Sequence, residues 1–154
     1  MSDVAIDSSV AVKWVLPESD SPRAEQCGLD VIQTGGRLII LDFAYAEVAN
    51  ALWKECHRGR LTAAEVAQQF RLFTSRPLQV VPAKPLLAAA LDLGMRYDCA
   101  VYDALFVAAT VDLGVTGVSA DVPLVQAVRA DFPHIILLRD WPPAAPRQPL
   151  TPAP

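Results

Sequence analysis

Short runs of β-branched and aliphatic residues alternate along this chain with longer stretches whose apolar positions repeat at helical spacing. The short runs predict strands over residues 4–7, 37–41, 78–81, 115–119 and 134–138. Strands that alternate with helices are typical of βαβ units, in which helices cover a parallel sheet. We therefore expect an α/β fold with a central parallel sheet of four or five strands.

Capping residues predict where the intervening helices begin. Ser21 before Pro22 offers an N-cap and a first-turn proline, and Asp42 offers a second cap. Thr62 and Glu65 have the spacing of a capping box, and Asp98 is the expected cap of a later, strongly apolar helix. The expected helices cover residues 21–34, 42–57, from 62 onward, 85–96, 100–113 and 123–131.

The composition fits one globular domain followed by a different C-terminal segment. The chain has 154 residues, of which 53% are hydrophobic and 19% charged, and its mean hydropathy is +0.29. These values exclude a disordered chain. Six of the 13 prolines fall in residues 142–154. We therefore expect a domain over residues 1–140 and an extended, mobile tail over residues 141–154.

Several classes of protein lack support in the sequence. No apolar stretch reaches the ~18 residues of a membrane span, and the first residues do not resemble a signal peptide, so we expect a cytoplasmic protein that does not enter a membrane. The three cysteines and the two histidines are too far apart for a disulfide framework or a zinc site. Glycine-rich nucleotide-binding motifs and the serine-hydrolase elbow are absent. Any metal must therefore be held by oxygen.

Four carboxylates follow strands or interrupt apolar helices. Asp7 closes the first predicted strand and Asp121 follows the fourth, while Glu47 and Asp103 lie in largely apolar helical segments. Each alone has an ordinary explanation as a helix cap, the solvated edge of a helix or a partner of the helix dipole. In parallel sheets, however, ligands bind beyond the carboxyl ends of strands where the strand order reverses. If the first and fourth strands are neighbours, Asp7 and Asp121 meet there.

A cluster of acids drawn from separate βα units carries strong mutual repulsion, which a divalent cation offsets. Oxygen ligands suit Mg²⁺ or Mn²⁺, which keep several waters and bind phosphate oxygens. One or two such ions can promote the attack of water on a phosphodiester. The four acids together therefore indicate hydrolysis of a phosphodiester bond.

The motifs around these acids resemble the PIN-domain family, and specifically its VapC-type toxin ribonucleases of type II toxin–antitoxin systems. The resemblance rests on D-x-S at residues 7–9, an acid at Glu47, Y-D-A-L-F-V-A at residues 102–108 and S-A-D-x-x-L at residues 119–124. It covers nearly the whole chain up to Trp141. It implies a three-layer α/β/α fold, an Mg²⁺- or Mn²⁺-dependent endoribonuclease, a cognate antitoxin that blocks the site, and a homodimer.

The resemblance also assigns roles to residues. It implies that Asp7, Glu47, Asp103 and Asp121 form the catalytic and metal-binding set. Ser9 matches the small hydroxyl that supports this set, and Ser119 stands where the family usually has Thr and keeps the hydroxyl. The expected products are a 5′-phosphate and a 3′-hydroxyl.

The distribution of charge suggests where RNA would bind. The chain has a net charge of −4 and a pI of about 5.0, which disfavours binding through a generally basic surface. Residues 54–76 nevertheless carry +3 and the remainder −7. Helical spacing places Glu47, Asn50 and Lys54 along one side of a helix. We take Lys54, Arg58 and Arg60 as candidates for contact with RNA, and a solvated helix face is the alternative.

Two other functions stay open at this stage. A PIN-fold module could bind RNA or a protein without cutting, although the chain carries all four acids. A receiver or phosphatase-like domain could use Asp7 as a phosphoacceptor. That possibility has less support because Ser8-Ser9 supplies no second Asp and no Lys follows the fourth strand.

Overall fold

Five parallel strands form the central sheet of the protein, whose computed structural model describes residues 3–142. The strands are β1 (Val4–Ile6), β2 (Leu38–Leu41), β3 (Leu78–Val81), β4 (Thr116–Ser119) and β5 (Ile135–Leu137). Their order in the sheet is β3-β2-β1-β4-β5. Each lies within one residue of its predicted limits, so the expected parallel sheet is confirmed.

The helices include every predicted one, an additional short pair after β1 and a 3₁₀ turn after β5. In chain order they are α1 (Ser8–Ala11), the 3₁₀ turn η1 (Val12–Trp14), α2 (Ser21–Gln33), α3 (Ala44–His57), α4 (Ala63–Thr74), the 3₁₀ turn η2 (Lys84–Leu86), α5 (Leu87–Tyr97), α6 (Val101–Leu113), α7 (Val122–Val128) and the 3₁₀ turn η3 (Leu138–Asp140). The sequence did not predict α1 and η1 because segments of three or four residues show no helical periodicity.

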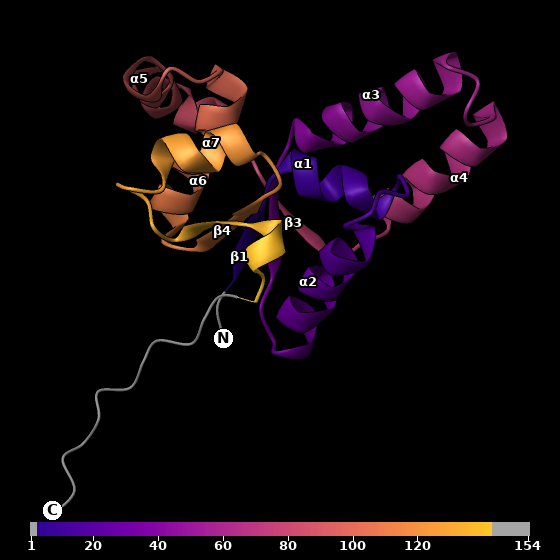
Figure 1. The fold of residues 1–154 in the computed structure, drawn as a ribbon, viewed down its shortest axis with the longest axis horizontal. Helices are drawn as coiled ribbons and strands as arrows, with labels where there is room; N and C mark the ends of the chain where they lie inside the picture. Colours follow the sequence, from indigo (N-terminus) through magenta and orange to yellow (C-terminus); the bar gives the residue numbers. More distant parts are fainter. Residues whose placement is uncertain (1–2, 143–154) are drawn as a thin grey trace, which may run out of the picture.

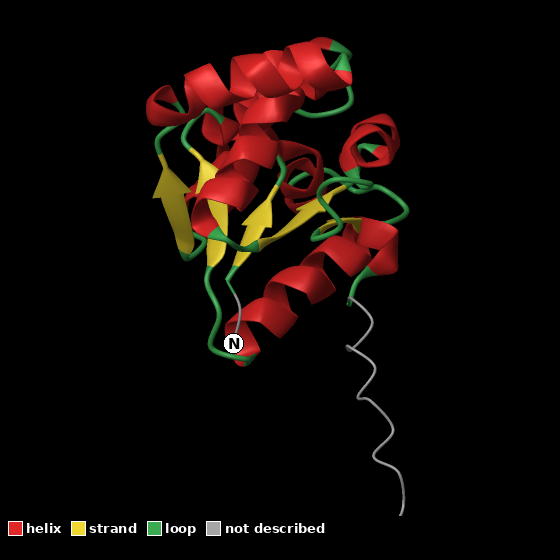
Figure 2. Cartoon of the chain, turned by 90° about the vertical axis from the view of Figure 1, so that its left-hand side faces the viewer, coloured by secondary structure: helices red, strands yellow, loops and turns green. Residues whose placement is uncertain are grey.

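The helices form two layers, one on each face of the sheet (Figures 1 and 2). Val4 and Ile6 of β1 pack against α1 to α4, whereas Ala5 between them packs in the cluster with α5 to α7. This alternation follows from the pleat of the strand, which points successive side chains to opposite faces. The expected three-layer α/β/α architecture is therefore confirmed.

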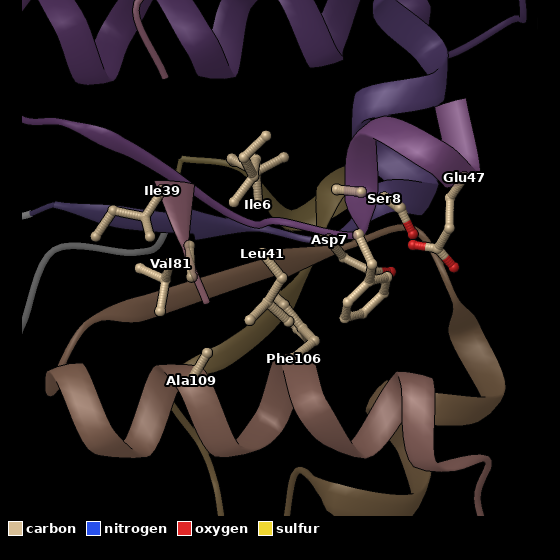
Figure 3. A pocket seen from close by; sticks show the side chains of 13 residues that line it. Ile6, Asp7, Ser8, Ile39, Leu41, Glu47, Val81, Phe106 and Ala109 are labelled. Atoms are coloured by element: carbon tan, nitrogen blue, oxygen red, sulfur yellow. The ribbon is translucent and has the colours of Figure 1, made fainter. Parts of the chain in front are cut away.

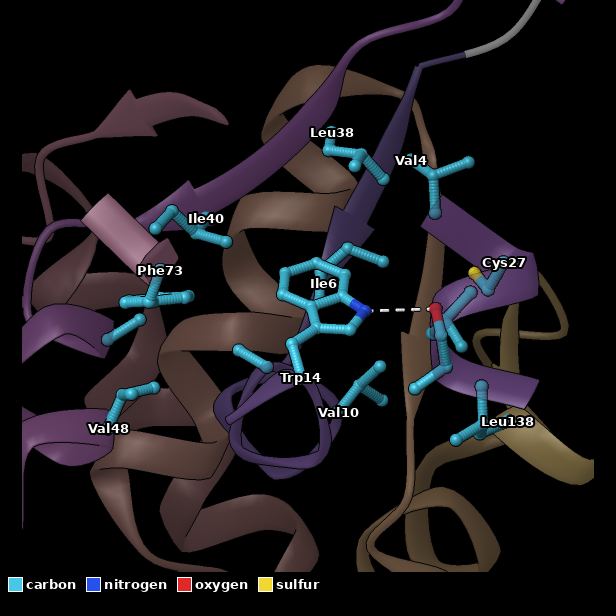
Figure 4. Close-up of a cluster of buried hydrophobic side chains, with 14 of the residues drawn as sticks. Val4, Ile6, Val10, Trp14, Cys27, Leu38, Ile40, Val48, Phe73 and Leu138 are labelled. Atoms are coloured by element: carbon cyan, nitrogen blue, oxygen red, sulfur yellow. Dashed lines mark hydrogen bonds between the residues drawn. The ribbon is translucent and has the colours of Figure 1, made fainter. Parts of the chain in front are cut away.

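Trp14 lies near the middle of the first core cluster (Figure 4). Its indole Nε1 donates a hydrogen bond of 2.9 Å to the carbonyl oxygen of Ala24 in α2. A buried tryptophan needs such a partner for its single polar group. This contact ties the segment after β1 to α2 and holds that segment against the sheet.

One of the predicted helix caps is confirmed and one is wrong by a single residue. Thr62 and Glu65 form the capping box at the start of α4. Ser21 is the first residue of α2, and the N-cap position belongs to Asp20. The Ser21 hydroxyl instead donates to the carbonyl oxygen of Leu16, so it stabilises the loop that leads into the helix.

The caps predicted at Asp42 and Asp98 are wrong. Helix α3 begins at Ala44, and the Asp42 carboxylate accepts a hydrogen bond of 3.2 Å from the backbone of Ala83 in the loop after β3. Asp98 ends α5 in the left-handed conformation, with φ +51°, instead of starting α6. Asp tolerates this conformation better than most residues other than glycine. The Asp42 side chain thus binds a loop, and the Asp98 backbone ends a helix.

Trp141, the first residue of the predicted tail, is part of the packed domain. Its side chain is 9% exposed, and its Nε1 donates to Asp30 at 2.9 Å. Arg23 also donates to the Trp141 carbonyl oxygen at 2.7 Å. Residues 143–154 of the predicted mobile tail lie outside the described residues. Within residues 3–142, none of the helices has both the length and the apolar character that a membrane crossing requires.

Candidate active site

The sheet brings the segments after β1 and β4 together. These two strands pair in parallel, with Val4 opposite Thr116 and Ile6 opposite Val118. The chain runs from β1 outward to β2 and β3 on one side and places β4 and β5 on the other, so the strand order reverses between β1 and β4. The position expected for a ligand site in such a sheet is therefore where Asp7 and Asp121 lie.

Asp7 is buried and accepts two hydrogen bonds from serine side chains. Its Oδ2 accepts from the hydroxyl of Ser9 at 2.5 Å and from that of Ser119 at 2.8 Å. The Ser9 oxygen also accepts from the backbone N–H of Ala120 at 2.9 Å. Both serines named from the sequence therefore fix the Asp7 carboxylate and join the ends of β1 and β4.

Asp121 is both a helix cap and a member of the cluster. Its Oδ1 accepts from the backbone N–H of Leu124 at 3.0 Å, which caps α7. Its own N–H donates to the Ser119 hydroxyl at 3.0 Å. Asp121 is thus a helix cap, as its ordinary explanation expects. The capping hydrogen bond orients the carboxyl group and leaves it able to bind a ligand as well.

Glu47 and Asp103 reach the same place from two helices, each from the first turn. Glu47 is half-buried, and its Oε2 is buried without a hydrogen-bond partner among the described residues. Figure 3 shows the Glu47 carboxyl group beside the hydroxyl of Ser8 at the start of α1. An unpartnered buried carboxylate oxygen is costly, which indicates that a ligand or water completes this site.

A single surface pocket contains all four predicted acids. Its lining residues are Asp7, Ser8, Ser9, Val12, Glu47, Asn50, Ala51, Lys54, Asp103 and Asp121. We refer to it as the acidic pocket. It joins α1, α3, the start of α6 and the segment after β4. The spatial convergence that the sequence could only suggest is therefore present.

The three basic candidates for contact with RNA differ in position. Lys54 lines the acidic pocket beside Asn50, one turn further along α3. Arg58 and Arg60 do not line the pocket, and both pair with Glu55, at 3.2 Å and 2.5 Å respectively. The single charge of Glu55 is thus shared between two arginines, and of the three candidates only Lys54 lines the pocket that holds the acids.

Mutual repulsion and burial raise the pKa values of three of the four acids. Burial is the main cause of the raised pKa of Asp7, and the charge of Asp121 adds to it, although the hydroxyls of Ser9 and Ser119 oppose the rise. Burial also raises the pKa of Glu47 and of Asp103, and each is raised further by the charge of Asp7. The site therefore holds more negative charge than its own residues stabilise.

The donor set fits a small, hard divalent cation. All four acids are oxygen donors, and the Oε2 of Glu47 has no hydrogen-bond partner among the described residues. No three acid, histidine or cysteine side chains of residues 3–142 stand close enough to enclose an ion directly. Mg²⁺ keeps several of its own waters and is held by only one or two carboxylates, so a wider arrangement of acids suits it.

An apolar cavity lies beside the acids, along the ends of β1 and β2 (Figure 3). Ile6, Leu41 and Phe106 are among its lining residues, and Asp7, Ser8 and Glu47 lie at one end. Apolar walls lower the local dielectric and strengthen every electrostatic interaction next to them. The cavity explains why burial is the main cause of the raised pKa of Asp7 and of Glu47.

Sequence reasoning missed Ser8. This residue lies in both the acidic pocket and the apolar cavity, where its hydroxyl stabilises the charged form of Glu47. It occupies the unspecified position between Asp7 and Ser9, so the D-x-S pattern gave no reason to select it. The signal that would have revealed it is the start of α1, which was too short to predict.

Sequence comparison finds two matches to this chain. The sequence model of the PIN domain matches residues 4–127. The chain is also 30% identical over 113 residues to Ribonuclease VapC3 of Pyrobaculum aerophilum, a match that covers 72% of this chain and 83% of that protein. The residues that match the family model include all four carboxylates of the acidic pocket.

Structural comparison finds the same architecture in three solved proteins. A Pyrobaculum aerophilum protein has a TM-score of 0.69 at 20% identity, covering 90% of this chain and 85% of that one. Mycobacterium tuberculosis VapC20, described as a toxin that cleaves the sarcin-ricin loop, has a TM-score of 0.62 at 14% identity, covering 81% and 95%. Rickettsia felis VapBC2, bound to a fragment of promoter DNA, has a TM-score of 0.59 at 12% identity, covering 87% and 96%. At these identities the likeness concerns the fold.

Proposed function

The chain belongs to the PIN-domain family and to its VapC group, and from that premise we propose that it is a divalent-metal-dependent endoribonuclease, the toxin of a toxin–antitoxin pair. The observation that carries the proposal is the convergence of Asp7, Glu47, Asp103 and Asp121 in one pocket at the carboxyl ends of β1 and β4. Ribonuclease activity in VapC3 supports the choice of RNA as the substrate.

Each acid has a role that its environment fits. Asp7, Asp103 and Asp121 would hold Mg²⁺ or Mn²⁺ in part through the ion's own waters, and Glu47 would complete the site or orient the attacking water. When bound, the ion would supply positive charge to the scissile phosphate and to the oxygen that leaves. Glu47 has a raised pKa and a free Oε2, so it is suited to take a proton from water.

Ser9 and Ser119 would act through Asp7. Their hydroxyls hold one oxygen of the carboxylate, which leaves its other oxygen oriented for a ligand. Lys54 lies in the pocket wall and would contact a phosphate of the RNA. Water that attacks phosphorus and breaks its bond to the 3′ oxygen leaves a 3′-hydroxyl and a 5′-phosphate.

The partner that we propose is a cognate antitoxin that blocks the acidic pocket in the cytoplasm. The structural likeness to Rickettsia felis VapBC2 supports this choice. The homodimer implied by the resemblance stays a prediction. Leu87, Leu91 and Met95 expose 45%, 52% and 70% of their surface along one side of α5, where a second copy could pack.

Cleavage of cellular RNA by the purified protein tests the proposal. We expect cutting with Mn²⁺ or Mg²⁺, none in EDTA, and products with 5′-phosphate ends that a 5′-phosphate-dependent exonuclease degrades. Metal-independent cutting, or products with 2′,3′-cyclic phosphates, would contradict the proposed chemistry. Binding of RNA without any cutting would instead favour the non-catalytic module.

A further inference from the structure

Trp53 on α3 is a large aromatic side chain that the catalytic proposal does not use. It exposes 56% of its surface, whereas Trp14 and Trp141 expose 7% and 9%. Tryptophan has one of the largest apolar side chains, so leaving it exposed forgoes more favourable burial than exposure of almost any other residue. An exposed indole in this position therefore suggests that a ligand covers it.

The indole ring of Trp53 stacks against a neighbouring ring on the same helix. The imidazole of His57, one turn further along α3, stacks on it with a centroid distance of 5.2 Å and an interplanar angle of 14°. This offset stacking restrains the ring at little cost in side-chain entropy. Because Trp53 is 56% exposed although His57 covers part of one ring face, much of the indole surface is open to another planar group.

The large side chains exposed beside Trp53 on α3 are polar, which favours a nucleobase over an apolar protein surface. The other large exposed residues of α3 are Asn50, Lys54 and His57, none of them aliphatic. A protein interface normally presents several adjoining apolar side chains, as Leu87, Leu91 and Met95 do on α5. A single aromatic platform beside a cation is instead typical of sites that bind unpaired nucleotides.

The position of Trp53 relative to the acids also suits a site that binds RNA. Trp53 lies six residues after Glu47 on α3, which corresponds to a rise of about 9 Å along the helix axis. Asn50 lines the acidic pocket and lies three residues before Trp53, so the two side chains are neighbours on the helix surface. RNA with a phosphate at the acids can therefore place a base from a nearby nucleotide over the indole.

We propose that Trp53, backed by His57, forms a base-stacking subsite that binds an unpaired nucleobase of the RNA a few nucleotides from the scissile phosphate. This inference rests on the proposed function and adds a binding site outside the acidic pocket. Lys54, which follows Trp53 on α3, contacts the phosphate backbone. The exposed side of α3 therefore binds both the base and the phosphate of the RNA.

The kinetics of Trp53→Ala test the subsite. Loss of one stacked base raises KM for an unpaired RNA by about 5- to 140-fold and leaves kcat within about twofold. Trp53→Phe keeps an aromatic face and recovers most of the affinity. Leu72→Ala is the matched control, because Leu72 on α4 has the same exposed fraction of 56% but no ring.

Two binding measurements separate stacking from charge. In the Asp103→Asn background, which prevents loss of the probe by cleavage, oligoadenylate quenches tryptophan fluorescence, and a blunt duplex does not. Trp53→Ala weakens binding without changing its salt dependence. Lys54→Ala weakens binding and lowers the slope of log K against log salt by about 0.7, as expected for one phosphate contact to a single strand.

The outcomes distinguish this inference from the proposed function. If the wild type cuts RNA and Trp53→Ala has the same KM, the subsite is wrong and the nuclease stands. If Trp53→Ala changes the oligomeric state or the binding of a protein but not of RNA, the subsite is also wrong and the indole is a protein contact. A wild type that neither binds nor cuts RNA overturns both.

Discussion

Asp7 is the residue on which most of the site depends. Its carboxylate lies at the end of β1, accepts hydrogen bonds from Ser9 and Ser119, and raises the pKa of Glu47 and of Asp103. A charged group at this place is stabilised only in part by the two hydroxyls, because burial and Asp121 both oppose ionisation. We therefore expect Asp7 to lower the stability of the metal-free protein while it enables metal binding.

Asp7→Asn tests this balance. In EDTA near pH 7, the variant is more stable than the wild type by on the order of 1 kcal/mol, because one buried like charge has been removed. The same variant does not cut RNA. Chemical denaturation in EDTA measures the free energy of unfolding, and unchanged or lower stability of the variant contradicts the account.

The pH dependence of this difference has a defined sign. The folded-state pKa of Asp7 is raised above its ordinary value of 3.8, so the folded protein binds the proton more tightly than the unfolded chain does. The ionised Asp7 therefore destabilises the wild type fully above its folded-state pKa, and this destabilisation disappears as pH falls through that pKa toward 3.8. Asp3 and Glu55 have lowered pKa values, so they change stability with pH in the opposite direction to Asp7. Because both residues are present in the wild type and in Asp7→Asn, their effect cancels in the difference between the two proteins.

Single residues were predictable from the sequence where a motif specified them. Asp7, Ser9 and Asp121 follow strands at positions that the motifs define, and the structure brings them together. Ser8 was not predicted because its role depends on the direction of α1. Arg58 and Arg60 were selected by charge alone, and their pairing with Glu55 could not be known without the turn after α3.

At the scale of elements, β4 and α6 pack closely against each other, and this contact fixes the position of one element relative to the other. Gly117 of β4 is buried against α6, where a Cβ atom would lie 2.6 Å from Thr110 Cγ2 and 2.8 Å from Phe106 Cζ. No side chain fits there without movement of α6. Because α6 carries Asp103 and β4 leads into Asp121, this packing also positions two of the four acids.

Gly117→Ala is expected to destabilise the protein by about 1–3 kcal/mol, because the added methyl group overpacks the contact between β4 and α6. Gly28→Ala is the matched control. A Cβ at Gly28 would lie 3.6 Å from Trp14 and 3.7 Å from Leu38, which are ordinary contacts, and alanine favours the interior of α2. It should be neutral or add about 0.5–1 kcal/mol.

Urea denaturation of the two variants beside the wild type measures both effects. Equal midpoints for Gly117→Ala and the wild type would show that β4 and α6 separate at little cost. Such freedom would be inconsistent with a site whose acids these elements hold in place.

The elements themselves were largely predictable, whereas their ends were less so. The strands matched within a residue because apolar runs between turn residues have clear limits. The cap predicted at Asp42 failed because its carboxylate accepts a hydrogen bond from the backbone of Ala83, and the cap predicted at Asp98 failed because this residue ends α5 in the left-handed conformation. An Asp before a helix signals a cap only when no tertiary contact competes for it.

At the scale of the molecule, strand order decides where the chemistry occurs. The reversal between β1 and β4 places two segments separated by more than a hundred residues at one edge of the sheet, and α3 and α6 bring the other two acids there. The sequence could state this only as a condition, because hydrophobic patterns predict strands but not which of them are neighbours. The family resemblance grouped the four acids into one set, and the structure supplied the strand order.

The most direct test of the central claim is the rate of RNA cleavage measured against Mn²⁺ concentration for the wild type, Asp103→Asn and Asp112→Asn. Asp103 lines the acidic pocket, whereas Asp112 lies exposed near the end of the same helix. We predict that the wild type and Asp112→Asn saturate at the same rate and metal concentration, while Asp103→Asn loses cleavage by at least about 100-fold or requires far more metal. Full activity of Asp103→Asn at the wild-type metal concentration would contradict the claim that this cluster of acids is a metal-dependent nuclease site.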